Sequence, residues 1–191
     1  MNYIVFDIET TDTLPYLNEK TVPTLDIAIL GAYNSKTKKY TSYTAEELVN
    51  FWPLIEETDA LIGFNSDTFD IPLLNKYYPG DLTDMKSIDL LSDVYKSLGR
   101  RIRLNNLAEA TLGEGKSSHG LIAIEWWQKG EVDKVRDYCL QDVKITKDLF
   151  EYAKKHGIIK WKDLTDIKDI KIDTSAWEIT DGGSVTQTLG L

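Results

Sequence analysis

Cysteine is nearly absent from this chain, because Cys139 is the only one among 191 residues. A single cysteine can form neither an internal disulfide nor a zinc knuckle. Long hydrophobic runs are missing as well, since no segment approaches the roughly 18 apolar residues of a membrane span. The N-terminus lacks the basic region and apolar stretch that mark a secretory signal. These absences predict a cytoplasmic protein that has no membrane partner.

Basic residues are outnumbered: 22 Lys and Arg face 31 Asp and Glu, which gives a net charge of −9 and a pI near 4.8. A chain this acidic does not draw affinity for nucleic acid from a basic surface. It remains compatible with an enzyme that acts on nucleic acid, because carboxylates that bind divalent ions reverse their own local field. The length and the 42% hydrophobic content suit one well-buried domain.

The first strand carries two acids. Residues 3–10 form an apolar run rich in β-branched and aromatic residues, which predicts a buried strand. Asp7 and Glu9 are two residues apart and therefore share one face of it. Two adjacent carboxylates on a central strand are costly unless a cation lies between them, and Mg²⁺ or Mn²⁺ prefers such oxygen ligands. The alternative is a strand that ends in two solvated acids.

Strand and helix patterns alternate along the rest of the chain, with three breaks in the helical region from 91 to 155. The predicted elements are a hairpin (25–33 and 38–43), a helix that begins at the cap Thr44, strands at 59–63 and 86–90, and a helix at 67–78. This order predicts an α/β domain with a mixed sheet, in which N-terminal antiparallel hairpin strands join parallel strands flanked by helices. The predicted domain covers residues 1–156. Residues 157–191 form a C-terminal extension with a small hairpin and a mobile tail.

A second group of acids lies where a strand leads into a helix, a common place for sites in open α/β sheets. Asp67 and Asp70 are expected in the first turn of that helix. Their alternative role is to complement the helix dipole.

A third group comprises Tyr138 and Asp142, whose spacing of four places them on the same face of a helix. Asp142 borders the apolar stripe of that helix and so points inward, where it needs a partner such as a metal shared with Asp7. The alternative is an ordinary Tyr–Asp pair on a half-exposed helix.

Taken together, the three groups resemble a known family. Phe6-Asp7-Ile8-Glu9-Thr10, Asn65 to Phe69-Asp70 and Tyr138-x-x-x-Asp142 are similar to the motifs of the DEDDy-type 3′→5′ exonucleases. That family has the ribonuclease H-like fold and includes the proofreading domains of B-family DNA polymerases. Residues 103–116 look like the linking region of stand-alone bacterial and archaeal members. The sister class has a histidine five residues before the last acid, where this chain has Asp137, so the resemblance is to the tyrosine subclass.

The resemblance implies roles for particular residues. Two divalent ions, Mg²⁺ or Mn²⁺, would be held by four acids, and Tyr138 would orient the attacking water; the acids are Asp7, Glu9, Asp70 and Asp142. The implied enzyme is a phosphodiester hydrolase that releases nucleoside monophosphates from the 3′ end of single-stranded or frayed DNA, as in proofreading or DNA repair. Alternatives are an RNA 3′-end trimming exonuclease and a non-catalytic binding module of the same fold. A polymerase or helicase partner would have to bind in trans.

Further residues are candidates for contact with the substrate strand: Thr10, Thr11, Asn65, Phe69, Arg100, Arg101, Arg103 and Lys116. Asn65 would either contact the strand or close a turn, and Phe69 would either stack on a base or belong to the core. The three arginines would guide the strand toward the metals, unless they are simply a solvated charge run. Cys139 is expected to be an inert core residue.

Overall fold

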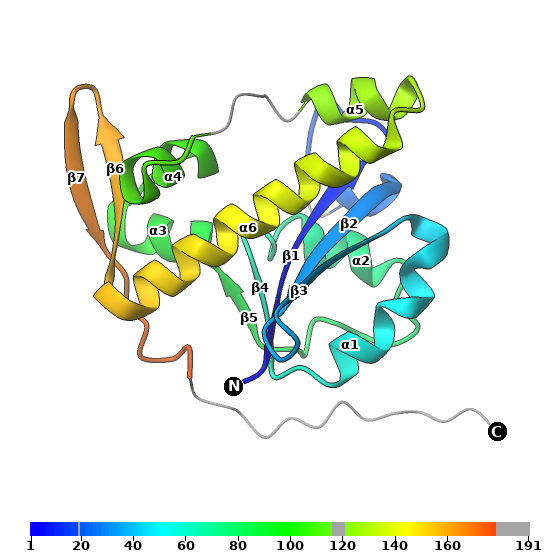
Figure 1. Ribbon diagram of the computed structural model, residues 1–191, viewed down its shortest axis with the longest axis horizontal. Coiled ribbons are helices and arrows are strands. Elements are labelled where there is room, and N and C mark those ends of the chain that lie inside the picture. Colours follow the sequence, from blue (N-terminus) through cyan, green and yellow to red (C-terminus); the bar gives the residue numbers. More distant parts are fainter. Residues whose placement is uncertain (19, 116–120, 179–191) are drawn as a thin grey trace.

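The computed structural model describes residues 1–18, 20–115 and 121–178, and Figure 1 shows how its elements are arranged. Five strands form one sheet in the order β3-β2-β1-β4-β5; they are β1 (Tyr3–Thr10), β2 (Ile27–Asn34), β3 (Lys39–Tyr43), β4 (Ala60–Gly63) and β5 (Ser87–Asp89). β1 pairs antiparallel with β2 and parallel with β4, β2 pairs antiparallel with β3, and β4 pairs parallel with β5. The predicted mixed sheet is therefore confirmed.

Helices flank this sheet. They are η1 (Val22–Thr24), η2 (Ala45–Asn50), α1 (Trp52–Glu56), α2 (Asp70–Asn75), α3 (Leu90–Leu98), α4 (Leu104–Leu112), α5 (Leu121–Gln128) and α6 (Val132–His156). The breaks predicted in the region from 91 to 155 separate α3, α4, α5 and α6, which confirms that part of the interpretation. In the described part of the chain, no helix combines the length and the apolar character that crossing a membrane would require.

The helix predicted after Thr44 is shorter and more irregular than expected. Thr44 and Glu47 do form the predicted capping box, but a 3₁₀ turn, η2, follows it. A separate short helix, α1, then begins with Pro53 in its first turn. Proline lacks a backbone N–H and fits the start of a helix better than its interior, so the continuous helix is interrupted here.

The predicted start of the next helix at Asp67 is wrong. α2 begins at Asp70, and Asn65 has φ +70°, a left-handed conformation that asparagine tolerates better than most residues. The backbone N–H groups of Asn65 and Asp67 donate to the carboxylate of Asp89 instead of entering a helix. A turn therefore carries the chain from β4 to α2.

The longest helix, α6, runs diagonally across one face of the sheet (Figure 1). It lies very close to β2. A Cβ added to Gly31 of that strand would be only 2.9 Å from Cys139 Sγ and 3.1 Å from Val143 Cγ2. Gly31 is also the register partner of Asp7 on β1. The missing side chain at Gly31 thus lets α6 approach the strand that carries the first two acids.

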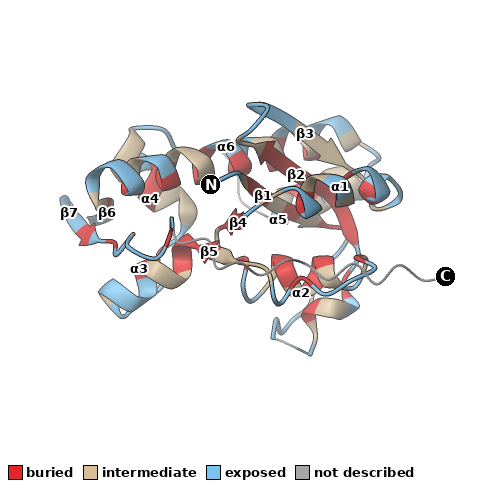
Figure 2. Cartoon of the chain, turned by 90° about the horizontal axis from the view of Figure 1, so that it is seen from below, coloured by how far each residue is buried: buried red, intermediate tan, exposed pale blue. Residues whose placement is uncertain are grey.

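Two large apolar clusters cover the two faces of the sheet, and Figure 2 shows buried residues along its central strands. Val5 joins the cluster that includes Val143 and Phe150 of α6. Phe6 joins the other cluster, which includes Leu74 of α2. The alternation of side chains along β1 therefore separates its α6 face, which carries Asp7 and Glu9, from its α2 face.

A second, two-stranded antiparallel sheet follows α6, as the sequence predicts for the C-terminal extension. It consists of β6 (Ile158–Asp163) and β7 (Asp166–Lys171) and lies beside α4 (Figure 1). Thr111 of α4 exchanges two hydrogen bonds with the backbone of Lys160, and Asn106 does the same with Lys162. These side chains take the place of a third strand along β6. The predicted mobile tail lies outside the described residues, and the domain boundary at 156 stays a prediction.

Candidate active site

Three carboxylates from two distant segments meet on the α6 face of the sheet. β1 supplies Asp7 and Glu9, and α6 supplies Asp142, which is buried at 8% exposure. Each offers one carboxylate oxygen, and these oxygens all lie within 4.8 Å of one another. Like charges this close repel one another unless a cation or a proton intervenes. A purely oxygen donor set with this charge fits a hard divalent ion such as Mg²⁺ or Mn²⁺.

Asp70 stands beside this group of three. It is the first residue of α2 and is buried, and its Oδ1 accepts a hydrogen bond of 3.0 Å from the backbone N–H of Ile8. Burial, and next the carboxylate of Asp7, raise the pKa of Asp70 well above its usual value. The strand that carries the first two acids thus also holds the fourth acid in place.

Tyr138 and Cys139 lie on α6, one turn before Asp142. The ring of Tyr138 is buried and packs edge-to-face on Trp126 of α5, with centroids 6.0 Å apart. Cys139 Sγ donates to the carbonyl oxygen of Asp7 at 3.3 Å and lies 3.6 Å from Asp7 Oδ2. Burial, and next the charge of Asp7, raise the pKa of this thiol well above its usual value, so it remains neutral.

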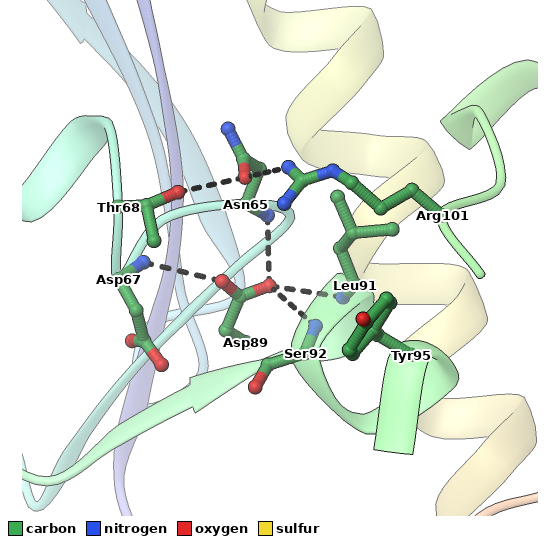
Figure 3. Close-up of a pocket in the computed structure, with 8 residues that line it drawn as sticks. All are labelled: Asn65, Asp67, Thr68, Asp89, Leu91, Ser92, Tyr95 and Arg101. Carbon is green, nitrogen blue, oxygen red and sulfur yellow. Dashed lines mark hydrogen bonds between the residues drawn. The ribbon is translucent and has the colours of Figure 1, made fainter. Parts of the chain in front are cut away.

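A single carboxylate organises the turn that leads to Asp70. Asp89 accepts four backbone N–H groups, which belong to Asn65 (2.8 Å), Asp67 (3.2 Å), Leu91 (2.9 Å) and Ser92 (3.3 Å). Figure 3 shows these contacts converging beside a cavity of about 110 Å³. Burial raises the pKa of Asp89, although the donated N–H groups act in the opposite direction. Asp89 therefore ties the turn to the N-terminus of α3.

The arginines of the loop between α3 and α4 separate in the structure. Arg101 lines the cavity beside Asp89 and donates to Asn65 Oδ1 (Figure 3). Arg100 lies 4.6 Å from the ring centroid of Trp161 on β6. Ile102 is buried between Arg101 and Arg103, which anchors the loop, and Arg103 is exposed just before α4. Of the predicted basic cluster, Arg101 contacts the turn before Asp70, whereas Lys116 lies outside the described residues.

The remaining candidates make contacts within the chain. The hydroxyl of Thr10 donates to the carbonyl oxygen of Asp12 at 2.7 Å. The backbone N–H of Thr11 donates to the carbonyl oxygen of Asp26 at 3.0 Å. Phe69 is half-buried and packs against the apolar cluster on the α2 face, away from Asp7. This packing favours the core alternative for Phe69.

Sequence reasoning missed two residues that shape the site. Gly31 permits the close contact between α6 and β2, and a glycine inside an apolar strand does signal such an approach. Trp126 supports the ring of Tyr138, but its place in a short apolar helix carries no signal of that role.

Comparisons with known proteins agree with this architecture. A sequence model described as the RNase_H superfamily matches residues 4–155. No match was found among the curated proteins. A solved structure, the family B DNA polymerase from the hyperthermophilic archaeon Pyrobaculum calidifontis, aligns with a TM-score of 0.61 and 18% identity.

That alignment covers 80% of this chain but only 24% of the polymerase chain, and identity this low shows the fold alone. The family match covers residues 4–155, which include all five strands of the sheet except Tyr3, α1 to α5 and all of α6 except His156. The three gathered acids also lie inside the matched range. The chain therefore belongs to the RNase_H superfamily.

Proposed function

We propose that this chain is a metal-dependent nuclease that removes nucleoside monophosphates from the 3′ end of single-stranded or frayed DNA. The observation that carries the proposal is the meeting of three carboxylate oxygens within 4.8 Å, supplied by Asp7, Glu9 and Asp142. Membership of the RNase_H superfamily supports a nuclease. The 3′→5′ direction rests on the resemblance of the three motifs to those of the DEDDy-type exonucleases.

Asp7, Glu9, Asp70 and Asp142 would hold two Mg²⁺ or Mn²⁺ ions. Such ions lower the pKa of a bound water and neutralise charge at the scissile phosphate. Asp70 is set against the backbone of Ile8, which keeps its carboxylate beside that of Asp7. Tyrosine is a poor base at neutral pH, so the task of Tyr138 is to orient the attacking water rather than to deprotonate it.

DNA is the favoured substrate because the motifs are most similar to those of proofreading domains. An RNA 3′-end trimming enzyme would use the same metal chemistry and would differ in its contacts with the 2′-hydroxyl. A direct comparison of the two substrates therefore belongs in the first experiment.

The test uses matching 5′-labelled single-stranded DNA and RNA with Mg²⁺, with Mn²⁺ or with a chelator. Wild type is compared with Asp7→Ala and with Asp133→Ala, a control that removes an exposed acid from the first turn of α6. The expected result is a ladder that shortens from the 3′ end, and that is lost with the chelator and in Asp7→Ala but not in Asp133→Ala.

Two other outcomes would redirect the proposal. Preferential shortening of RNA would assign the chain to RNA 3′-end trimming. A folded protein that binds Mn²⁺ in a calorimeter but degrades neither strand would point to a binding module, or to an enzyme that needs a polymerase or helicase partner in trans.

A further inference from the structure

Asn65 is held in an unusual backbone conformation where β4 leaves the sheet. Its φ is +70°, and its backbone N–H donates to Asp89 Oδ1 at 2.8 Å. Asn65 lies five residues before Asp70, in the turn that positions this acid. The backbone of Asn65 is therefore fixed by Asp89, independently of what its side chain does.

Chemistry fixes the orientation of the Asn65 side chain. A guanidinium group has only donors, so the amide atom that faces Arg101 must be the oxygen Oδ1. The hydroxyl of Thr68 donates to the same oxygen at 2.9 Å. Oδ1 thus has two donors for its two lone pairs. Figure 3 shows the amide nitrogen of Asn65 turned away from both Thr68 and Arg101.

This arrangement makes the end of Asn65 that is turned away from Thr68 and Arg101 a hydrogen-bond donor. Asn65 is half-buried and Arg101 is exposed, so both remain accessible to a ligand. The acceptors that a nucleic acid strand offers all along its backbone are phosphodiester oxygens. A donor next to a guanidinium suits such an oxygen, because the positive charge strengthens the interaction.

We propose that Arg101 is a positioning residue, which holds the side chain of Asn65 so that its amide N–H₂ donates to a phosphodiester oxygen of the substrate strand. The inference rests on the proposed function, because it takes the ligand to be a nucleic acid strand. It differs from the simpler idea that Arg101 contacts the strand directly as one of several guiding cations. In that case, the effects of substituting Arg101 and Asn65 on strand binding would be independent of each other.

A double-mutant cycle separates these two roles, since residues that act through each other give non-additive effects. The variants are Arg101→Ala, Asn65→Ala and the pair together. The control is Lys36→Ala, which removes an exposed cation, paired with Glu57, in the turn between β2 and β3. Binding of 5′-fluorescein-labelled oligothymidylate is measured by fluorescence anisotropy with Ca²⁺, an ion that also takes oxygen ligands but with looser geometry.

Each single variant is expected to weaken binding about tenfold, the scale of one hydrogen bond to a charged group. The double variant is also expected to be about tenfold weaker, and Lys36→Ala should bind as wild type does. Arg101→Lys should restore part of the affinity, because an ammonium can still donate to Asn65 Oδ1.

Asn65→Asp sharpens the test. The aspartate keeps an acceptor for Arg101 and Thr68 and tolerates the positive φ, but it replaces the amide donor with an acceptor that carries a charge like that of the phosphate. It should therefore bind the oligonucleotide more weakly than Asn65→Ala, while its urea midpoint stays close to that of wild type. If Asn65 had only a structural role, Asn65→Asp would bind the oligonucleotide more tightly than Asn65→Ala.

Several results would overturn the inference. A double variant weakened about a hundredfold would show additive, and hence direct, contacts. Wild-type affinity in Asn65→Asp would show that no donor is used. Failure of the wild-type protein to bind or degrade either DNA or RNA would overturn the proposed function itself, and the inference with it.

Discussion

The two halves of the candidate site are held by different forces. In the strand–helix half, Asp7 and Glu9 on β1 face Asp142 on α6, and close packing at Gly31 sets the distance between the two elements. In the turn half, the backbone N–H groups of Asn65 and Asp67 donate to the carboxylate of Asp89, and the backbone N–H of Ile8 donates to Asp70. The strand–helix half is thus held by packing between regular elements, whereas the turn half is held by a few hydrogen bonds to carboxylates. The two halves should therefore fail differently when they are altered.

The largest effect is expected from the strand–helix half. Asp142→Asn should lower the rate of DNA shortening by more than about a hundredfold, since even indirect contacts to metal ligands commonly account for ten- to a hundredfold. In the metal-free protein the same change should raise the free energy of unfolding, because it removes one of three clustered charges. Asp133→Asn is the matched control. Unaltered turnover in Asp142→Asn would contradict the assignment of this half.

The turn half should respond mainly in stability. Asp89→Ala removes the acceptor of four backbone N–H groups and should lower the free energy of unfolding by about 3 kcal/mol. Asp89→Asn should cost less, because the amide keeps one acceptor oxygen. Urea unfolding measures both, with the exposed Asp84→Ala as the control. A loss no larger than that of the control would mean that the turn is held by other contacts.

Gly31→Ala tests the packing that joins α6 to the sheet. The added Cβ would lie 2.9 Å from Cys139 Sγ, and overpacking of this kind costs about 1–3 kcal/mol. Adding Cys139→Ala should restore part of the loss, because it removes the nearest atom. The melting temperatures of the two single variants and the double variant give the coupling. If the second change does not help, the close contact between α6 and β2 is not what limits stability.

The smallest effect is expected from Cys139→Ser. The serine hydroxyl can donate to the carbonyl oxygen of Asp7 as the thiol does, so the change should cost less than about 1 kcal/mol and keep most of the nuclease activity. Turnover and urea midpoint are the two measurements. A folded variant without activity would assign Cys139 a chemical role that the proposed mechanism does not contain.

The strand–helix half can be predicted from the sequence because its residues follow the regular periods of a strand and a helix. The period of two along β1 placed Asp7 and Glu9 on one face, and the spacing of four on α6 did the same for Tyr138 and Asp142. The apolar stripe of the helix also indicated that Asp142 points inward. The mixed sheet could be predicted for the same reason, since its strands and crossover helices have clear patterns.

The turn half could not be predicted in this way. The acids at Asp67 and Asp70 suggested the first turn of a helix, but Asp89 takes the N–H groups that would have begun it. The contact between Arg101 and Asn65 joins residues 36 positions apart and has no periodic signal. Their neighbouring positions in the sequence suggest one basic cluster, yet Arg100 packs on Trp161 while Arg101 contacts Asn65 in the turn. Long-range hydrogen bonds decided these positions.

The burial of Cys139 makes it an internal reporter of motion. It is the only cysteine of the chain, it is fully covered, and it lies between α6 and the strand that bears Asp7. A maleimide can reach this sulfur only when α6 lifts from the sheet or the whole protein unfolds, so the rate of alkylation measures how often that happens. An ion bound by Asp7 and Asp142 would hold α6 against the sheet and so slow the alkylation of Cys139. The rate of one chemical modification can thus reveal how tightly the site is closed, without any substrate.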